Sequence, residues 1–320
     1  MFDLISIGDT AVDTIIPLID AKILEKDGNE FLSLPFGYKV PVNPSVSMVG
    51  GNAANNAVGS ARLGLKTAIY TNVGNKDEDE WDMRIIAKFK KEKVDIRYIC
   101  ESPQLPSGHN IVLDYKGKRT ILIHHQPWEY ELPDLDSCKW VYLTSMAESH
   151  TRSNIIDQVL NFSGRSGARL AYQPGTLQIQ MGQKKNNNIM VSSFIFVCNL
   201  EEAKTFLGID ISEKVPVKKL LSKLCDLGPK MVVITDGSNG SFGFDGVNFY
   251  QMGIYPAKLV EMTGCGDAYA TTLVAGLFYG KDLKEAMKWG AVNSASVVEH
   301  VGSQEGLLTL NQIKEKIKNF

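Results

Sequence analysis

The chain from residue 139 to residue 235 alternates short apolar stretches with amphipathic ones, and most apolar stretches end in polar or glycine-bearing residues. This alternation predicts strands at 140–144, 169–172, within 189–198 and at 231–235, and helices at 153–162, 200–207 and 215–224. Strands that alternate with helices form a mostly parallel sheet with helices on both faces. The expected fold is therefore α/β, with a ligand crevice beyond the carboxyl ends of the strands.

The flanking regions extend this pattern. Upstream, we expect strands at 2–8, 66–73 and 94–100, and helices at 50–63 and 77–92. Downstream, we expect a hairpin at 242–255, a helix at 268–279, a helix at 282–299 that either continues or breaks near Gly290, and a final helix at 309–319. The polar stretch 183–188 is expected to be a loop.

Two segments do not fit a strand–helix unit and predict a separate small sheet. Residues 15–49 are rich in proline, which suits loops and edge strands rather than a helix. Residues 107–125 hold two strand-like runs around Lys116-Gly117-Lys118, which is typical of a hairpin. We expect the two segments to form a β-sheet lid over the active site. Since no linker divides the chain, residues 1–320 are expected to form a single domain.

The composition is that of an ordinary globular protein, with 44% hydrophobic and 22% charged residues. A net charge of −2 gives no electrostatic reason to expect nucleic acid or an anionic membrane as a partner. The N-terminus lacks the basic leader and apolar core of a signal peptide, and no window is apolar enough to span a membrane. The cysteines are odd in number and form no CxxC pair, which favours reduced thiols in the cytoplasm.

Residues 260–270 carry the strongest candidate for chemistry. Gly264, Cys265 and Gly266 lie between an apolar, strand-like approach and a helix that is apolar on nearly every face, and Asp267 falls in the first helical turn. A helix N-terminus offers unpaired N–H groups and partial positive charge, and glycines let an anionic ligand approach the backbone. A carboxylate there can accept a proton from an attacking hydroxyl, which suits phosphoryl transfer.

Simpler explanations exist for the same residues. An acidic residue in a first turn often only complements the helix dipole. Gly264-x-Gly266 nearly matches a dinucleotide-binding fingerprint, but Tyr269 occupies the third glycine position and Asp267 would repel a pyrophosphate. Cys265 is either a reactive thiol at a helix N-terminus or a small residue that fits the turn.

Other chemistries find no support in the sequence. Neither a P-loop nor a GxSxG elbow is present. Adjacent His124 and His125, if they lie on a strand, point to opposite faces and do not suit one metal ion.

A second group of candidates lies near the N-terminus. Asp13 comes just past the first strand, where it can bind a sugar hydroxyl or cap a turn. Gly50 and Gly51 precede a helix of small residues, and they permit either close approach of a ligand or a tight turn. Asn55 can both donate and accept hydrogen bonds, which suits a polyol.

Together these residues resemble the ribokinase/PfkB family of carbohydrate kinases. The N-terminal signature of that family runs from Gly50-Gly51 through Asn55 and Ala57 to Gly64 and Gly74. Its C-terminal signature, usually Asp-Thr-x-Gly-Ala-Gly-Asp, is matched by Glu-Met-Thr-Gly-Cys-Gly-Asp at 261–267. The resemblance covers nearly the whole chain. It implies a three-layer αβα core with a β lid and transfer of the ATP γ-phosphoryl group to a hydroxyl of a sugar or sugar-like substrate.

The resemblance also implies roles for individual residues. Asp267 would be the general base, and the backbone of Gly264, Cys265 and Gly266 would form the anion hole. Sugar contacts are expected at Asp13, Gly50, Gly51 and Asn55, and nucleotide contacts at Asn199, Glu202, Thr235, Gly237, Asn293 and Gly302. Mg²⁺ bound to the ATP phosphates is expected near Asn199 and Glu202, which belong to an Asn-x-x-Glu motif.

The chain departs from the family pattern at several positions. Some members bind a monovalent cation near the positions of Glu261 and Thr263. Here Glu261 replaces the usual aspartate and Met262 the usual threonine, which argues against K⁺ activation. Ala11 stands where ribokinase-like members often have a sugar-binding asparagine. Residues 173–176 lack the Asp-x-Asn-x-Arg pattern of 2-keto-3-deoxygluconate kinases.

The sequence therefore predicts a cytoplasmic, ATP-dependent kinase of a small sugar, with lid strands that can pair between subunits in a homodimer. The alternatives are a nucleoside kinase on the same fold and a non-catalytic nucleotide-binding protein. Asp267 beside the glycine turn argues against the second alternative, because a binding module has no use for a base there.

Overall fold

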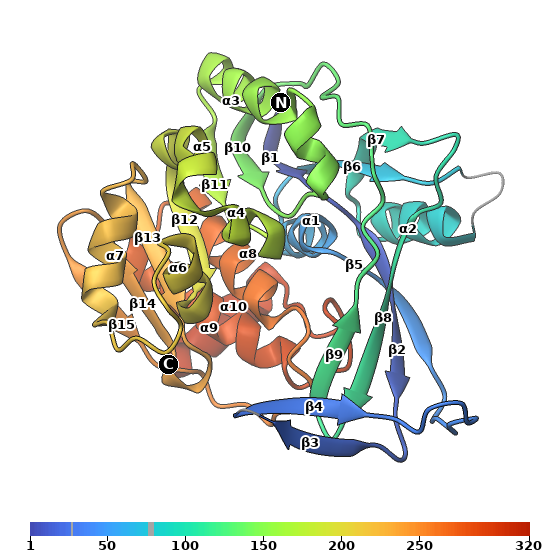
Figure 1. Ribbon diagram of the computed structural model, residues 1–320. Helices are drawn as coiled ribbons and strands as arrows, with labels where there is room; N and C mark the ends of the chain where they lie inside the picture. Colours follow the sequence, from blue (N-terminus) through green and yellow to red (C-terminus); the bar gives the residue numbers. More distant parts are fainter. Residues whose placement is uncertain (27, 76–79) are drawn as a thin grey trace.

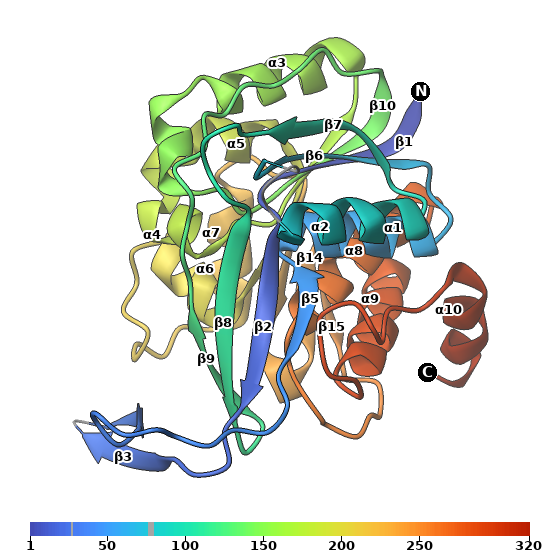
Figure 2. The same cartoon turned by 90° about the vertical axis from the view of Figure 1, so that its right-hand side faces the viewer.

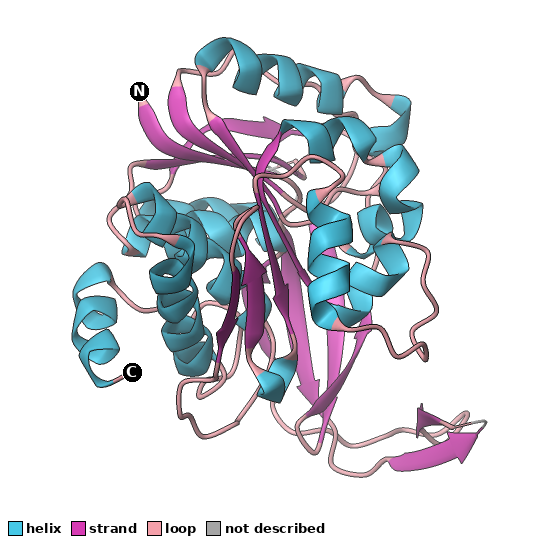
Figure 3. Ribbon diagram, turned by 90° about the vertical axis from the view of Figure 1, so that its left-hand side faces the viewer, coloured by secondary structure: helices cyan, strands magenta, loops and turns pink. Residues whose placement is uncertain are grey.

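The computed structural model describes residues 1–26, 28–75 and 80–320. A large sheet runs through its centre with helices on both faces, and a smaller sheet projects from the body (Figures 1 and 3). This arrangement confirms the expected α/β fold, with three layers in the core and a β lid. No helix in the described part of the chain is long and apolar enough to cross a membrane.

The central sheet is parallel except at one end, where β14 pairs antiparallel with both of its neighbours, β13 and β15. Its strands, in spatial order, are β15 (Phe249–Met252), β14 (Ser241–Phe244), β13 (Met231–Thr235), β12 (Ser193–Asn199), β11 (Arg169–Tyr172), β10 (Cys138–Leu143), β1 (Phe2–Ile7), β6 (Thr67–Val73) and β7 (Asp95–Glu101). The chain moves from β1 to β6 and β7 and then returns to β10 on the other side of β1. Strand order thus reverses at β1, and a ligand crevice is expected beyond the carboxyl ends there.

One face of the sheet is covered by the helices of the middle of the chain. They are α3 (Ile155–Ser166), α4 (Thr176–Lys185), α5 (Asn187–Ser192), α6 (Leu200–Phe206) and α7 (Val217–Cys225), with the short 3₁₀ helices η1 (Glu148–Arg152) and η2 (Gly237–Asn239) in the connections. Their apolar sides pack with the buried Tyr172 and Phe196 side chains of the sheet. Interior strands such as β1 and β6, which helices cover on both faces, are buried along nearly their whole length.

The other face is covered by helices from both ends of the chain. They are α1 (Asn52–Arg62), α2 (Glu80–Lys91), α8 (Cys265–Phe278), α9 (Leu283–Val297) and α10 (Leu310–Lys316), which continues into η3 (Ile317–Asn319). Helix α9 is continuous, so the alternative with a break near Gly290 is wrong. A Cβ atom at Gly290 would lie 2.9 Å from the Tyr269 carbonyl oxygen, so this glycine serves close packing of α9 on α8.

The lid is a four-stranded sheet in the order β5 (Val46–Gly50), β2 (Ala11–Pro17), β8 (Gly108–Tyr115) and β9 (Lys118–Leu122) (Figure 2). The predicted hairpin is confirmed: β8 and β9 pair around Lys116 and Gly117, whose φ angles of 53° and 77° suit a tight two-residue turn. A separate hairpin of β3 (Lys22–Lys26) and β4 (Asn29–Ser33) extends beyond the lid (Figures 1 and 2).

Two local expectations are wrong. Residues 183–188 are mostly helical, because α4 resumes after a kink at Gly182 and ends at Lys185, and α5 begins at Asn187. Polarity suggested a loop, but the buried Asn186 amide donates to the carbonyls of Gln178 and Gly182 and is satisfied inside the fold. The strand-like approach to Gly264 is an irregular segment, since β15 ends at Met252. The predicted start of the helix at 77–92 lies outside the described residues, and α2 is described from Glu80.

Candidate active site

The glycine turn before α8 holds the predicted catalytic residues in place. Gly264 has a φ angle of 78°, and a Cβ atom there would lie 2.4 Å from the Cβ of Ser303, so only glycine fits. A Cβ atom at Gly266 would meet no atom within 4 Å. The first turn of α8 is therefore fixed on the Gly264 side and open on the Gly266 side, where helix geometry leaves N–H groups without intrahelical acceptors.

Asp267 is held by three side-chain amides. Asn55 donates to one carboxylate oxygen at 2.7 Å, while Asn52 and Gln173 donate to the other at 2.9 and 3.0 Å. The Asp267 side chain comes from α8, the two asparagines from α1, and Gln173 from the loop after β11. The carboxylate is thus oriented by groups that meet only in the folded chain.

Burial raises the pKa of the Asp267 carboxyl above its ordinary value. The three amide hydrogen bonds and the positive charge of Arg119 oppose this increase by stabilising the carboxylate. An aspartate with a raised pKa is a better proton acceptor than an exposed one, which suits a general base.

Asn55 connects Asp267 to the loop before α10. Its amide oxygen accepts hydrogen bonds from the Ser303 hydroxyl at 2.9 Å and the Gln304 amide at 3.0 Å. The side chain is buried, and these contacts turn its NH₂ group toward Asp267. Asn55 therefore acts on Asp267 in this structure, whereas its predicted contact with a sugar stays a prediction.

The lid contributes Asp13 and Arg119 to the same region. Asp13 lies on β2, accepts a 2.9 Å hydrogen bond from Asn110 on β8, and is close enough to Gly50 that a Cβ atom there would lie 2.3 Å from its carboxylate. Burial raises the pKa of Asp13, with a further increase from Asp267 and Glu261, whereas Asn110 and Arg119 lower it. Asp13, Asp267 and Glu261 thus share one electrostatic environment.

Gly51 is fixed by its surroundings in the same way as Gly264. Its φ angle is 92°, and a Cβ atom would lie 2.8 Å from the Asp9 carbonyl oxygen. The glycine pair allows the start of α1 to approach the loop after β1.

Glu261 is buried below the lid. Its carboxylate accepts hydrogen bonds from the Thr263 hydroxyl and, at 2.7 Å, from the Gly302 amide, and it lies 3.9 Å from the Arg119 guanidinium. The predicted nucleotide residue Gly302 is thus tied to the predicted cation site. Within residues 1–26, 28–75 and 80–320, no group of three or more His, Cys, Asp or Glu residues could hold a metal ion.

The predicted nucleotide residues fall into two groups. Asn199 and Glu202 form a capping box at the start of α6, with both hydrogen bonds at 2.8 Å. Thr235 ends β13, and Gly237 has open space beside its Cα. Asn293 lies apart from them: it is fully buried, donates to Thr272 at 2.6 Å and accepts from the Leu308 amide at 2.9 Å. Both ends of the Asn293 amide therefore form hydrogen bonds inside the fold.

A pocket of about 200 Å³ opens beside Asn52 and Gln173. It lies at the reversal of strand order, and its polar lining includes Asp9, Asn110, His124, His125, Gln126, Ser145, Thr176 and Glu202. Both histidines lie beyond the end of β9, so the argument that they point to opposite faces of a strand does not apply. Burial and the neighbouring His124 lower the pKa of His125, which favours a neutral imidazole that can bind a hydroxyl.

Sequence reasoning missed Asp9, which lines this pocket. Its carboxylate accepts hydrogen bonds from the Tyr130 hydroxyl at 2.7 and 2.8 Å and from the Ala147 amide at 2.7 Å. Burial raises the pKa of Asp9 to about 7. A signal was present, because Asp9 follows the first strand directly and ligands bind beyond strand ends.

Comparison with known proteins decides the family. Residues 16–310 match the model of the pfkB family carbohydrate kinases. The chain belongs to the PfkB family. A 5-dehydro-2-deoxygluconokinase from Clostridium perfringens is 25% identical, with 99% of this chain and 93% of that protein covered. An ATP-dependent 6-phosphofructokinase from Thermoanaerobacterium thermosaccharolyticum is 23% identical, with 98% and 93% covered.

Solved structures show the same fold. Arabidopsis thaliana ribokinase complexed with ribose and ATP superposes with a TM-score of 0.81 at 22% identity, with 99% of each chain covered. A putative ribokinase II from E. coli in complex with ATP and Mg²⁺ superposes with a TM-score of 0.77 at 18% identity over the full length of both chains. The family model and the sugar kinases among its relatives together make this chain an ATP-dependent sugar kinase. Kinases of this type use ATP and Mg²⁺.

The site of this PfkB kinase fits the groups that such a reaction needs. The open first turn of α8 suits the phosphates of a nucleotide. The Glu202 carboxylate lines the pocket and lies within electrostatic reach of Asp267, and burial raises its pKa. Carboxylate oxygens are ligands that Mg²⁺ accepts. Burial also raises the pKa of the Cys265 thiol, which favours a residue that fits the turn over a reactive thiolate.

Proposed function

We propose that this kinase transfers the γ-phosphoryl group of ATP to a hydroxyl of a small neutral sugar, with Asp267 as the general base. The observation that carries this proposal is the buried Asp267 carboxylate, oriented by three amides beside the open first turn of α8. Asp267 accepts the proton of the attacking hydroxyl, and the backbone of Gly264, Cys265 and Gly266 stabilises the negative charge on the transferred group.

The lining of the pocket supports a neutral acceptor. Its described lining residues include hydroxyl, amide and imidazole groups but no lysine or arginine, so nothing there matches the charge of a sugar phosphate. A volume of about 200 Å³ is small compared with the pockets of drug-sized ligands, which start at about 300 Å³. Asn52 and Gln173, which line the pocket with Gly51, both donate to Asp267 and so connect the pocket to the proposed base. Contacts of the sugar with Asp13 and Gly50 are part of the proposal.

The nucleotide side rests on different residues. We infer that the phosphates lie at the start of α8, with Mg²⁺ near Asn199 and Glu202, and that Thr235, Gly237 and Gly302 border the nucleotide. Bound Mg²⁺ neutralises phosphate charge. The predicted position of a monovalent cation is near Glu261 and Thr263. The Arg119 guanidinium, 3.9 Å from Glu261, already supplies positive charge there and argues against a need for K⁺.

The lid and the exposed hairpin favour a dimer. We propose that residues 1–320 form one catalytic domain. Its lid comes from the two expected segments, 15–49 and 107–125, although the lid sheet already begins at Ala11 and the β3–β4 hairpin lies outside it. The β3–β4 hairpin and the segment after it expose large apolar side chains, among them Phe31 at 51%, Phe36 at 100% and Tyr38 at 80%. Such a surface fits a second copy of the lid.

The proposed compartment is the cytoplasm. The free cysteines fit the reducing environment there.

A substrate panel tests the proposed function. ADP release should be measured with neutral sugars such as ribose and fructose, with 5-dehydro-2-deoxygluconate and fructose 6-phosphate, which the names of the relatives suggest, and with adenosine and inosine. We expect the highest kcat/KM with a neutral sugar. A preference for a nucleoside would support the alternative kinase, and ATP binding without ADP formation from any acceptor would support a non-catalytic protein.

A further inference from the structure

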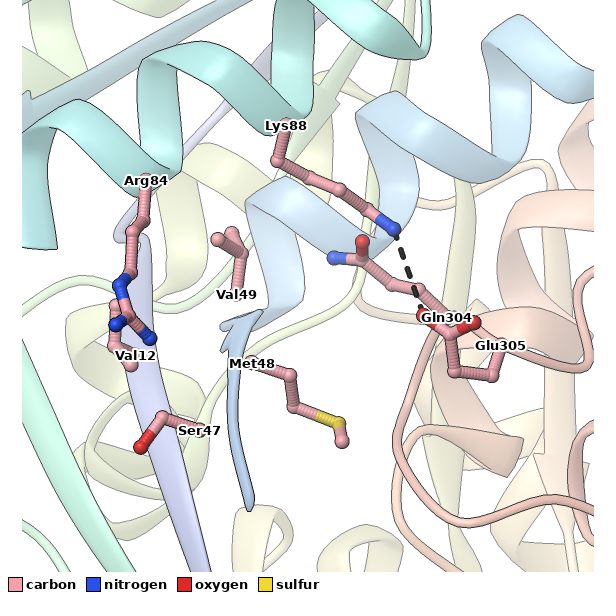
Figure 4. A pocket seen from close by; sticks show the side chains of 8 residues that line it. All are labelled: Val12, Ser47, Met48, Val49, Arg84, Lys88, Gln304 and Glu305. Carbon is pink, nitrogen blue, oxygen red and sulfur yellow. Dashed lines mark ion pairs between the residues drawn. The ribbon is translucent and has the colours of Figure 1, made fainter.

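A second pocket, of about 240 Å³, lies between the lid and helix α2 (Figure 4). It is lined by Val12, Ser47, Met48, Val49, Arg84, Lys88, Gln304 and Glu305. Successive side chains of a strand point to opposite faces, so Val12 and Asp13 lie on opposite sides of β2. This pocket is therefore behind the lid strand that carries Asp13, and none of its lining residues belongs to the pocket beside Asn52.

One wall of this pocket is basic and another is apolar. Arg84 and Lys88 lie one turn apart on α2 and both extend toward the pocket (Figure 4). Val12 and Val49 supply the apolar wall from the lid strands. A ligand that combines an anionic group with a short apolar body matches both walls.

Glu305 is the only acidic residue that lines this pocket in the described part of the chain, and it is loosely held. It lies 3.6 Å from the Lys88 ammonium, which also contacts Glu92 at 3.3 Å, and its side chain is 57% exposed. Arg84 is half exposed and pairs with Glu80 outside the lining. An incoming carboxylate can replace Glu305 beside Lys88 without burying an unpaired charge.

Gln304 provides a polar group that lacks a partner. Its side chain is 2% exposed, and its NH₂ group donates to Asn55. Its amide oxygen has no hydrogen-bond partner within the described residues. A buried acceptor without a donor is unfavourable. Protein atoms cover this oxygen, so a small shift of the Gln304 side chain would let a ligand hydroxyl donate to it.

Gln304 also connects this pocket to the catalytic residues. The hydrogen bonds run from Gln304 to Asn55 at 3.0 Å and from Asn55 to Asp267 at 2.7 Å. The backbone carbonyl oxygen of Gln304 accepts a 2.8 Å hydrogen bond from the Arg62 guanidinium, which holds the main chain in place. A ligand that binds the Gln304 side chain therefore also acts on the Asn55 amide, which orients Asp267.

We propose that this pocket is a regulatory site for a short-chain hydroxycarboxylate. Its carboxylate pairs with Arg84 and Lys88, its hydroxyl donates to the Gln304 amide oxygen, and its carbon chain packs on Val12 and Val49. Binding orders the Gln304–Asn55–Asp267 chain and lowers the KM of the acceptor sugar.

Binding is tested without any assay of activity, by calorimetric titration of the full chain with 3-hydroxybutyrate. We expect saturable binding, weaker binding of butyrate, which lacks the hydroxyl, and no binding of 1,3-butanediol, which lacks the charge. The double variant R84Q/K88Q should lose affinity by about ten-fold or more. Its matched control is K90Q/K91Q, which removes the same charge from exposed positions of the same helix.

The outcomes separate the possibilities. No saturable binding, or equal affinity in R84Q/K88Q and K90Q/K91Q, overturns the site. Circular dichroism melting checks that R84Q/K88Q is folded, and the single variant Arg84→Gln, at a half-exposed position, gives the same test if it is not. For coupling, we expect the probe to lower the acceptor KM about five-fold in the wild type and to have no effect in Gln304→Leu. An unchanged KM despite binding overturns the coupling, whatever the acceptor proves to be.

Discussion

The side chains of Asn55 and Asp267, 212 residues apart in the sequence, are joined by a 2.7 Å hydrogen bond between helices α1 and α8. This contact brings the N-terminal and C-terminal family signatures together. It gives Asn55 a role in orienting the proposed base, beside its expected role in binding the acceptor.

The variant Asn55→Leu keeps the number and branching of the side-chain heavy atoms but removes the donor. Loss of a hydrogen bond that lowers the pKa of Asp267 should raise that pKa further. The acid limb of the kcat–pH profile should then move to higher pH, and kcat at neutral pH should fall about ten-fold. A profile measured from pH 5 to pH 9 checks this, and an unchanged acid limb would contradict the role of the contact.

Arg119 is expected to act on the active site from the lid. It lies near Glu261, and its charge lowers the pKa values of Asp13 and Asp267. The variant Arg119→Gln should lower kcat by about ten-fold or more, because a positive charge near the transferred phosphoryl group is lost. The matched control is Lys118→Gln, which removes a charge next in sequence where the side chain pairs with Glu30. Equal effects of the two substitutions on kcat would contradict a specific role for Arg119.

Asp9 should make the protein less stable as the pH rises. Its pKa of about 7 in the folded state lies above the ordinary aspartate value, so between about pH 4 and pH 7 the folded state binds more protons than the unfolded state. The free energy of unfolding therefore loses this contribution as the pH rises through that window. In Asp9→Asn the loss should be absent, while the amide can still accept from Ala147 and donate to Tyr130.

Urea unfolding of the wild type and Asp9→Asn at pH 4.5, 6 and 7.5 measures this difference. The stability of the wild type relative to the variant should decrease from the first pH to the last. A constant difference across these pH values would show that Asp9 is ionised in the folded protein.

The exposed lid hairpin should govern the oligomeric state. The double variant Phe31→Ser/Phe36→Ser replaces two exposed apolar side chains beyond the lid sheet. Light scattering after size exclusion should show a dimer for the wild type and a monomer for the variant. The control Val247→Ser alters an 81% exposed residue between β14 and β15 and should leave the mass unchanged. A monomeric wild type would contradict the proposed dimer.

The sequence predicted those parts of the site that depend on local chemistry. Small residues before an apolar helix were sufficient to place Gly264 and Asp267 at its first turn, and paired glycines were sufficient for the start of α1. The pattern Asn199-x-x-Glu202 also has a local meaning, since the structure makes it a capping box.

The remainder of the site could not be read from the sequence because it depends on which strand ends meet. Gln173 reaches Asp267 only because the order of strands places β11 beside β10, next to β1. Asp9 is likewise defined by the fold, through its burial beneath Tyr130. Asn293 differs from Asp9, because it was a predicted site residue. Its position in the sequence gave no sign that both ends of its amide form hydrogen bonds inside the fold.

The most direct test of the proposed mechanism is the turnover of Asp267→Asn with the best acceptor of the substrate panel. The variant keeps the shape of the side chain but cannot accept the hydroxyl proton. We predict that kcat falls by about 10²–10⁴-fold while the dissociation constant for Mg·ATP, measured by calorimetry, stays within about three-fold of the wild type. A kcat within about two-fold of the wild type would contradict the assignment of Asp267 as the general base.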